Sequence, residues 1–248
     1  MLLNAREWGD PSGAPVVCAH GLTGHGRRFG ELASRLPASR VVGVDLRGHG
    51  SSGYEPPWDI RTNVADLLET ATALGIERAA WVGHSFGGRL VAELEAAAPD
   101  RVERAVLLDP AMHIVPEVAL ERAELLRADT SFATPDEAID ARLTDGSLFT
   151  TTRSTLEDEA EAHLEQGLDG RWRWRFSALA AIVAWSEMSE PAPPFPRCPT
   201  LVVLGARSWI PVDVPVAPNV EVVTVPGGHS VLWDDFDATA TAVAAFLG

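Results

Sequence analysis

The sequence has few cysteines and no residue spacing typical of a metal site. Cys18 and Cys198 are the only cysteines among 248 residues, and each lies beside or within an apolar run. Two distant cysteines do not make the framework of a disulfide-rich secreted domain, so we expect reduced, buried thiols. Aspartates and histidines are scattered rather than paired at metal-ligand spacing. The sequence therefore predicts a chain that works without a metal ion.

Positive charge and long hydrophobic runs are also scarce. Lys and Arg number 20 against 35 Asp and Glu, which gives a formal net charge of −15. This charge disfavours a nucleic-acid backbone or an anionic membrane as partner. No apolar run approaches the length of about 20 residues that crosses a bilayer, and residues 1–10 have no charged-then-apolar leader. We expect a cytoplasmic protein with a small-molecule substrate, and the sequence leaves the oligomeric state open.

Short apolar runs alternate with helical patterns in the first 110 residues and again after residue 196. Strand-like runs occupy residues 16–19, 41–44, 79–82, 102–108, 200–204 and 220–225, and helical spacing occupies residues 29–36, 60–74, 88–98 and 236–247. Apolar strands separated by helices are typical of a parallel sheet covered on both faces. The fold class is therefore α/β, with a mostly parallel sheet flanked by helices in residues 1–110 and 197–248.

The buried-strand pattern disappears between residues 111 and 196. Helical patterns cover residues 116–126 and 178–188, and Thr134 followed by Pro135 is an N-cap signature. Ser154 and Glu157 form a capping box for a helix that should end at Gly167, with His163 on its exposed face. Alternating arginines and aromatics at residues 171–176 favour a strand or an edge. We expect residues 111–196 to be a mainly helical insertion.

The pentapeptide Gly83-His84-Ser85-Phe86-Gly87 carries the strongest chemical signal. It lies between an apolar strand-like run and a helical pattern. A serine on a sharp strand-to-helix turn is held exposed for nucleophilic attack, and the flanking glycines let the backbone bend without a Cβ clash. The motif predicts Ser85 as a nucleophile.

Three further segments fit an acyl-transfer site. They are His20-Gly-Leu-Thr, Asp45-Leu-Arg-Gly-His-Gly-Ser-Ser and Pro226-Gly-Gly-His229, each after an expected strand. The backbone N–H groups of Leu22 and Phe86 could hold an oxyanion, and His229 could reach Ser85 as a base. Residues 48–53 also match the dinucleotide pattern G-x-G-x-x-G, but the prolines that follow cannot open the required helix. We therefore expect no nucleotide cofactor.

These four motifs, in this order, resemble the α/β-hydrolase superfamily over nearly the whole chain outside the insertion. The resemblance implies that Ser85 is the nucleophile and that His229 acts first as general base and then as general acid. It also implies that Leu22 and Phe86 form the oxyanion hole. The insertion would be a cap that covers the pocket and selects the substrate.

The third member of the catalytic triad departs from the usual pattern. Superfamily members often carry an aspartate after the strand that here ends at Leu204, but Ser208 occupies that place. Asp109, at the end of the strand 102–108, and Asp213, a few residues beyond the usual place, are the two candidates. The acid must be buried and within hydrogen-bond reach of the imidazole, which a residue fixed at a strand end meets more readily. We therefore favour Asp109.

The sequence thus predicts a cofactor-independent serine hydrolase that cleaves a carboxylic ester of a small to medium, fairly apolar substrate. The same scaffold could instead cleave a C–C bond, a lactone, a thioester or an aminoacyl bond. A non-catalytic protein that holds a ligand in the pocket is the alternative from another class.

Overall fold

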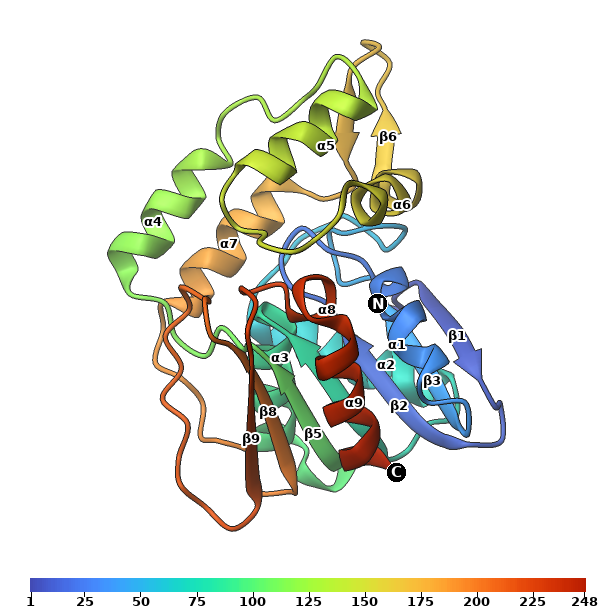
Figure 1. Cartoon of the computed structure of the whole chain (residues 1–248). Helices are drawn as coiled ribbons and strands as arrows, with labels where there is room; N and C mark the ends of the chain where they lie inside the picture. The colour runs from blue at the N-terminus through green and yellow to red at the C-terminus, as the bar shows by residue number, and fades with distance from the viewer.

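The computed structural model describes residues 1–248, in which a seven-stranded sheet carries helices on both faces and a separate lobe over one end (Figure 1). The strand order is β1-β3-β2-β4-β5-β8-β9, and only β1 runs antiparallel to its neighbour. The strands are β1 (Ala5–Gly9), β2 (Ala14–Ala19), β3 (Ser39–Val44), β4 (Ala79–His84), β5 (Val102–Leu108), β8 (Thr200–Gly205) and β9 (Val220–Val225). The predicted α/β fold is confirmed.

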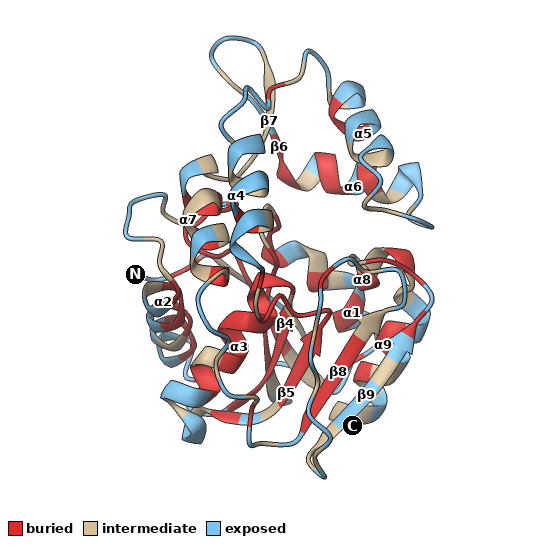
Figure 2. Cartoon of the chain, turned by 90° about the vertical axis from the view of Figure 1, so that its left-hand side faces the viewer, coloured by how far each residue is buried: buried red, intermediate tan, exposed pale blue.

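Two hydrophobic cores lie on opposite faces of this sheet. On one face, α2 (Ile60–Ala73) and α3 (Phe86–Ala97) pack Leu67, Leu90 and Leu94 against the strands. On the other, α1 (Gly30–Ser34) and α9 (Phe236–Leu247) contribute Leu32 and Val243. The central strands are therefore buried on both sides (Figure 2), which is why they are continuous apolar runs rather than alternating ones.

The strand β1 was missed by the sequence prediction. Ala5 and Trp8 are half-buried and its other three residues are exposed, as expected of a solvated edge strand. An edge strand of five residues contains too little apolar sequence to be recognised without its partner β3. Helix α3 begins at Phe86, two residues before the expected start at Gly88.

The lobe lies between β5 and β8 in the sequence. Its helices are α4 (Pro116–Leu125), α5 (Pro135–Thr144), α6 (Arg153–His163) and α7 (Ala178–Met188), and the short strands β6 (Leu164–Gln166) and β7 (Trp172–Trp174) form a hairpin. The lobe lies over the end of the sheet at which the parallel strands terminate (Figure 1). It has a small core of its own around Leu156 and Ile139.

The boundaries of α6 correct two expectations. The helix is capped by Thr152, whose side chain accepts a hydrogen bond from the Thr155 amide, so Ser154 is not the N-cap. It ends at His163 rather than Gly167, because the chain enters β6 at Leu164 and pairs with β7. Strand pairing, which depends on a distant segment, therefore overrides the local helix signal. In contrast, Thr134 caps α5 as expected by accepting from the Glu137 amide.

None of the helices combines the length and apolar character that crossing a bilayer requires.

Candidate active site

Ser85 lies on a sharp turn between β4 and α3. Its backbone has φ 54° and ψ −118°, in a region that a residue with a side chain rarely adopts. A Cβ on Gly83 would lie 2.2 Å from the Gly87 carbonyl oxygen, and one on Gly87 would lie 2.1 Å from that of Ala19. Glycine is therefore required at both positions, since the turn leaves no room for a side chain. The strain is held in place by the Ser85 amide, which donates to the Leu108 carbonyl at 3.0 Å.

His229 reaches Ser85 from the loop after β9. Its Nε2 lies 2.8 Å from Ser85 Oγ, although the two residues are 144 positions apart. The ring of His84 lies 4.9 Å from the His229 ring, and His84 Nε2 donates to the His229 carbonyl at 2.9 Å. His84 therefore holds the backbone of the loop that carries His229.

Asp109 supplies the carboxylate beside His229. Its Oδ2 accepts from His229 Nδ1 at 2.6 Å, and its Oδ1 accepts from the Gly205 amide at 2.9 Å. The Ser208 hydroxyl also donates to Oδ2 and in turn accepts from the Ile210 amide. Asp109 is 1% exposed, whereas Asp213 lies exposed on the loop after β8. Ser208 thus occupies the place where an aspartate was expected, and its hydroxyl orients the carboxylate of Asp109, directly after β5.

The loop after β2 lies directly against the serine. A Cβ on Gly21 would approach Ser85 Cβ to 2.8 Å, so the backbone there is packed on the turn. The Leu22 amide donates to no group of the chain. The Phe86 amide opens α3, where no preceding helical turn supplies an acceptor. The structure therefore brings two free backbone donors to the neighbourhood of Ser85 Oγ.

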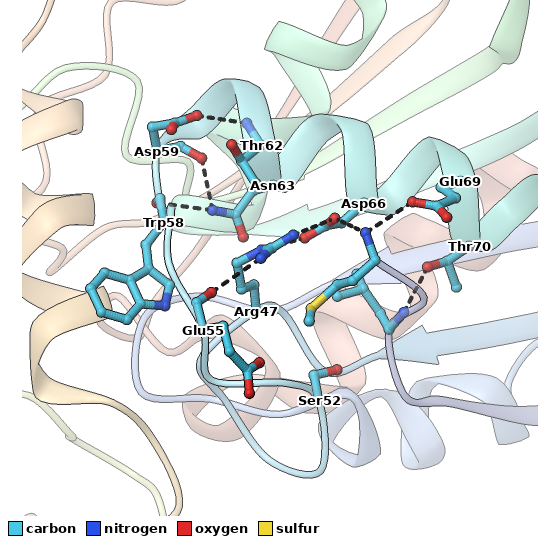
Figure 3. A network of polar contacts seen from close by, with 12 residues as sticks. Arg47, Ser52, Glu55, Trp58, Asp59, Thr62, Asn63, Asp66, Glu69 and Thr70 are labelled. Atoms are coloured by element: carbon cyan, nitrogen blue, oxygen red, sulfur yellow. Dashed lines mark hydrogen bonds and ion pairs between the residues drawn. The ribbon is translucent and has the colours of Figure 1, made fainter.

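The second motif, residues 45–52, has a structural role. Asp45 accepts from the Gly26 amide, which ties its loop to the segment after β2, and from the Ser51 amide within the loop itself. Arg47 forms a two-pronged ion pair with Asp66 on α2, and Asp66 also accepts from the amino group of Met1 (Figure 3). These ion pairs fix the loop and the N-terminus to α2.

Comparisons with known proteins agree with this architecture. The alpha/beta hydrolase family matches residues 16–243. The chain belongs to the alpha/beta hydrolase family. It is 35% identical to "Lipase LipV" of Mycobacterium tuberculosis, over 81% of this chain and 77% of that protein. It is 27% identical to "Esterase YbfF" of Escherichia coli, over 82% of this chain and 89% of the relative.

A solved structure extends the likeness to nearly the full length. The crystal structure of E-2-(acetamidomethylene)succinate hydrolase has a TM-score of 0.84 and 25% sequence identity, covering 99% of this chain and 94% of the other. The protein is thus a hydrolase whose relatives include a lipase and an esterase. The fold, the family and the enzyme class were all predicted from the sequence, and the comparisons confirm them.

Four histidines meet at the loop after β2, two from the loop itself and two from other segments, and sequence reasoning did not anticipate the arrangement. His20 Nε2 accepts from the Leu46 amide at 2.9 Å, and His49 Nε2 accepts from the Thr23 amide at 3.2 Å. His163 was expected on an exposed helix face but is only 1% exposed. Its ring stacks on that of His25 at 4.5 Å. His163 is buried because β6 and β7 fold over the end of α6. Helix periodicity does not encode this contact between segments.

Two histidines, His113 and His25, each bond to a residue of the segment 111–196. His113 Nδ1 donates to the Glu190 carbonyl at 3.1 Å at the base of the lobe. His25 Nε2 lies 2.8 Å from Glu159 Oε2 on α6, and Arg28 binds the other oxygen of this carboxylate. His25 therefore joins the hydrolase core to the lobe, and neither histidine contacts Ser85.

Asp234, on the short helix α8 (Val231–Asp234), joins the lobe to the loop of His229. Its Oδ1 accepts from the amides of Phe149, Thr150 and Thr151 at 3.0 to 3.2 Å, and its Oδ2 accepts from the Gly228 amide at 3.0 Å. Burial alone would raise the pKa of Asp234, but these donors outweigh it and the pKa is lowered. The ionised carboxylate thus links the lobe to the residue beside His229.

A cavity opens beside the chain neighbours of Ser85 and His229, between the loop after β2 and α8. Phe29, Leu232 and Trp233 form its apolar part. His84 and Ser230, the chain neighbours of Ser85 and His229, line it with His20 and Arg28. The guanidinium of Arg28 lies 4.4 Å from the Trp233 ring, so this aromatic wall is held in place by a cation–π contact.

The burial of two histidines leads us to expect that the protein loses stability as the pH falls below about 6.5. Burial lowers the pKa of His49 to about 4 and that of His163 to about 2, with the nearby His25 adding to the shift at His163. In the unfolded chain both rings take up a proton near pH 6.5, so protonation below that pH favours unfolding. We expect the free energy of unfolding at pH 5 to be lower than at pH 7.5 by up to about 2 kcal/mol for each of these rings.

Denaturant unfolding at the two pH values tests this prediction. His163→Gln removes one titrating ring, so the difference between pH 7.5 and pH 5 should shrink in that variant. Equal stability of the wild type at both pH values would contradict the account of the buried, neutral rings.

Proposed function

We propose that this hydrolase cleaves carboxylic esters through an acyl-enzyme on Ser85, without a cofactor. The observation that carries the proposal is the continuous chain of hydrogen bonds from Ser85 Oγ through His229 to Asp109, at 2.8 and 2.6 Å. A nucleophile bonded to a base, which is itself oriented by a buried carboxylate, is the arrangement that activates a serine. The lipase and esterase among the relatives favour an ester as the substrate.

In the first half of the reaction, His229 Nε2 takes the proton of Ser85 Oγ while Oγ attacks the carbonyl carbon. The carbonyl oxygen becomes an oxyanion, and the amides of Leu22 and Phe86 donate to it. Each such donor contributes about 3 kcal/mol to the transition state. The tetrahedral intermediate then expels the alcohol oxygen, which receives the proton from His229, and Ser85 is left acylated.

In the second half, water replaces the alcohol. His229 takes a proton from the water as its oxygen attacks the acyl carbon, and the same two amides hold the second oxyanion. Collapse of this intermediate returns the proton to Ser85 Oγ and releases the carboxylic acid. Asp109 keeps its negative charge throughout and stabilises the imidazolium that forms twice in each cycle.

The lining of the cavity beside the triad supports a small to medium, fairly apolar substrate. Phe29, Leu232 and Trp233 offer an apolar wall to a short acyl or alcohol group. Residues 111–196 lie above this end of the sheet, where a cap would select the substrate. Lactones, thioesters, aminoacyl bonds and C–C bonds remain alternative targets of the same machinery, as does ligand binding without catalysis.

A panel of matched substrates tests the proposal. We expect kcat/KM for a chromogenic short-chain ester to exceed that for a lactone, a thioester, an aminoacyl ester and a C–C bond substrate by about tenfold or more. A higher value for one of the other classes would replace the ester as the substrate. No turnover of any class, together with saturable binding of a substrate analogue, would favour the non-catalytic alternative.

A further inference from the structure

Thr23 has an unusual backbone conformation at a critical position. Its φ is 61°, in the left-handed region that a residue with a branched Cβ rarely adopts. It directly follows Leu22, whose free amide is one of the two donors assigned to the oxyanion. This conformation costs about 1–2 kcal/mol, so the surroundings must hold it.

Two histidines hold the two polar groups of Thr23. His49 Nε2 accepts from the Thr23 amide at 3.2 Å, and His163 Nε2 lies 3.1 Å from the Thr23 carbonyl oxygen, to which it donates. An amide can only donate and a carbonyl can only accept, so the two rings must be opposite tautomers. His49 carries its proton on Nδ1, from which it donates to the Arg47 carbonyl at 3.1 Å. His163 carries its proton on Nε2.

The second ring nitrogen of His163 agrees with this assignment. Nδ1 of His163 is buried and has no hydrogen-bond partner. An unprotonated nitrogen without a partner costs less than an N–H group without an acceptor, because an N–H would be an orphaned donor. The contact with Thr23 is thus the only polar contact of this ring, although the ring is almost fully buried.

The two histidines come from different parts of the molecule. His49 lies on the loop after β3, within the core, whereas His163 is the last residue of α6, in the lobe. The place of His163 is fixed by its stacking on His25, which in turn pairs with Glu159 one helical turn earlier. The lobe therefore contacts the backbone of the loop after β2 through a rigid, aromatic side chain.

We propose that His49 and His163 are positioning residues that hold Thr23 from both sides and thereby aim the Leu22 amide at the oxyanion. The inference rests on the proposed function of the site. It gives the lobe a role in the chemical step besides covering the pocket. The Leu22 donor acts on charge that develops only in the transition state, so loosening it lowers kcat while KM changes little.

The decisive experiment compares two substitutions at one position. His163→Leu removes the donor to the Thr23 carbonyl, whereas His163→Gln offers an amide N–H at nearly the same reach as Nε2. We expect His163→Leu to lower kcat for a short-chain ester about 10- to 100-fold with KM within about threefold, and His163→Gln to retain most of the wild-type kcat. Affinity for a boronic acid that mimics the tetrahedral intermediate should fall in parallel with kcat. His113→Leu, at the base of the lobe, is the matched control and should leave kcat unchanged.

An equal loss of kcat in His163→Leu and His163→Gln would overturn the proposal, because the loss would then follow from altered packing rather than from the missing hydrogen bond. Unchanged kcat in His163→Leu, or a rise in KM alone, would do so as well. Thermal unfolding at pH 7.5 shows whether each variant folds. If His163→Leu does not fold, the pair His49→Leu and His49→Gln makes the same comparison from the core side.

The hold of His49 and His163 on Thr23, called the clamp below, can also be tested apart from catalysis. Amide hydrogen exchange of residues 21–24 should be faster in His163→Leu than in His163→Gln or the wild type, since the loop is released on one side. If the wild-type protein hydrolyses no ester yet this difference is seen, the proposed function fails and the clamp stands. If esters are hydrolysed but exchange and kcat are the same in all variants, the clamp fails and the function stands.

Discussion

Ser85→Ala is expected to lower kcat/KM for a short-chain ester by a factor of about 10⁴ or more, with the fold retained. The substitution removes the hydroxyl oxygen proposed to form the acyl-enzyme, while His229 and Asp109 keep their hydrogen bond at 2.6 Å. The residual rate should come from the backbone donors and from binding alone. Alanine has the same Cβ as serine, so it adopts the φ of 54° at this turn at a similar cost.

Steady-state kinetics with a chromogenic ester, together with circular dichroism and thermal unfolding, check this expectation. Ser34→Ala is the matched control, because Ser34 is exposed at the end of α1 and bonds only to the Glu31 carbonyl. The control should retain wild-type activity. Retained activity in Ser85→Ala would show that another residue is the nucleophile.

The second large effect is expected at Asp109. Asp109→Asn replaces a buried carboxylate that accepts from His229 Nδ1 with a neutral amide, so the imidazolium loses its stabilising charge and the ring can adopt the wrong tautomer. We expect kcat to fall by about 10³- to 10⁴-fold. Asp213→Asn, on an exposed loop, should leave kcat within about twofold.

The same pair of substitutions decides which acid belongs to the triad. A crippling effect of Asp213→Asn with a mild one of Asp109→Asn would reverse the assignment. Ser208→Ala tests a weaker perturbation of the same site, because it removes one hydrogen bond to the Asp109 carboxylate and leaves the charge in place. Its effect should be smaller than that of Asp109→Asn, about tenfold, since the Gly205 amide still holds the other carboxylate oxygen.

Local patterns in the sequence were sufficient to predict the central sheet and the residues around Ser85. Parallel strands buried on both faces are apolar throughout, and their carboxyl ends meet at one edge of the sheet. Residues placed just after β2, β4, β5 and β9 must therefore come together. Leu22, Ser85, Asp109 and His229 each follow one of these strands, which is why the sequence alone points to them.

The features that were missed depend on contacts between distant segments. β1 is recognisable only beside β3, and α6 ends at His163 because Leu164 pairs with Trp174 of β7. The burial of His163 follows from this hairpin, since a helix pattern alone placed it towards solvent. The contacts of His49 and His163 with Thr23 join three segments and have no signature within any one of them.

The most direct test of the central claim is to locate the site of covalent labelling. A fluorophosphonate reacts with a serine hydroxyl that is activated by a base, and peptide mass spectrometry identifies the modified residue. We expect a single adduct on Ser85 in the wild type and a labelling rate at least about 10³-fold lower in His229→Gln, in which the hydroxyl has lost its imidazole. An adduct on another residue, or equal labelling of Ser85 with and without His229, would contradict the account.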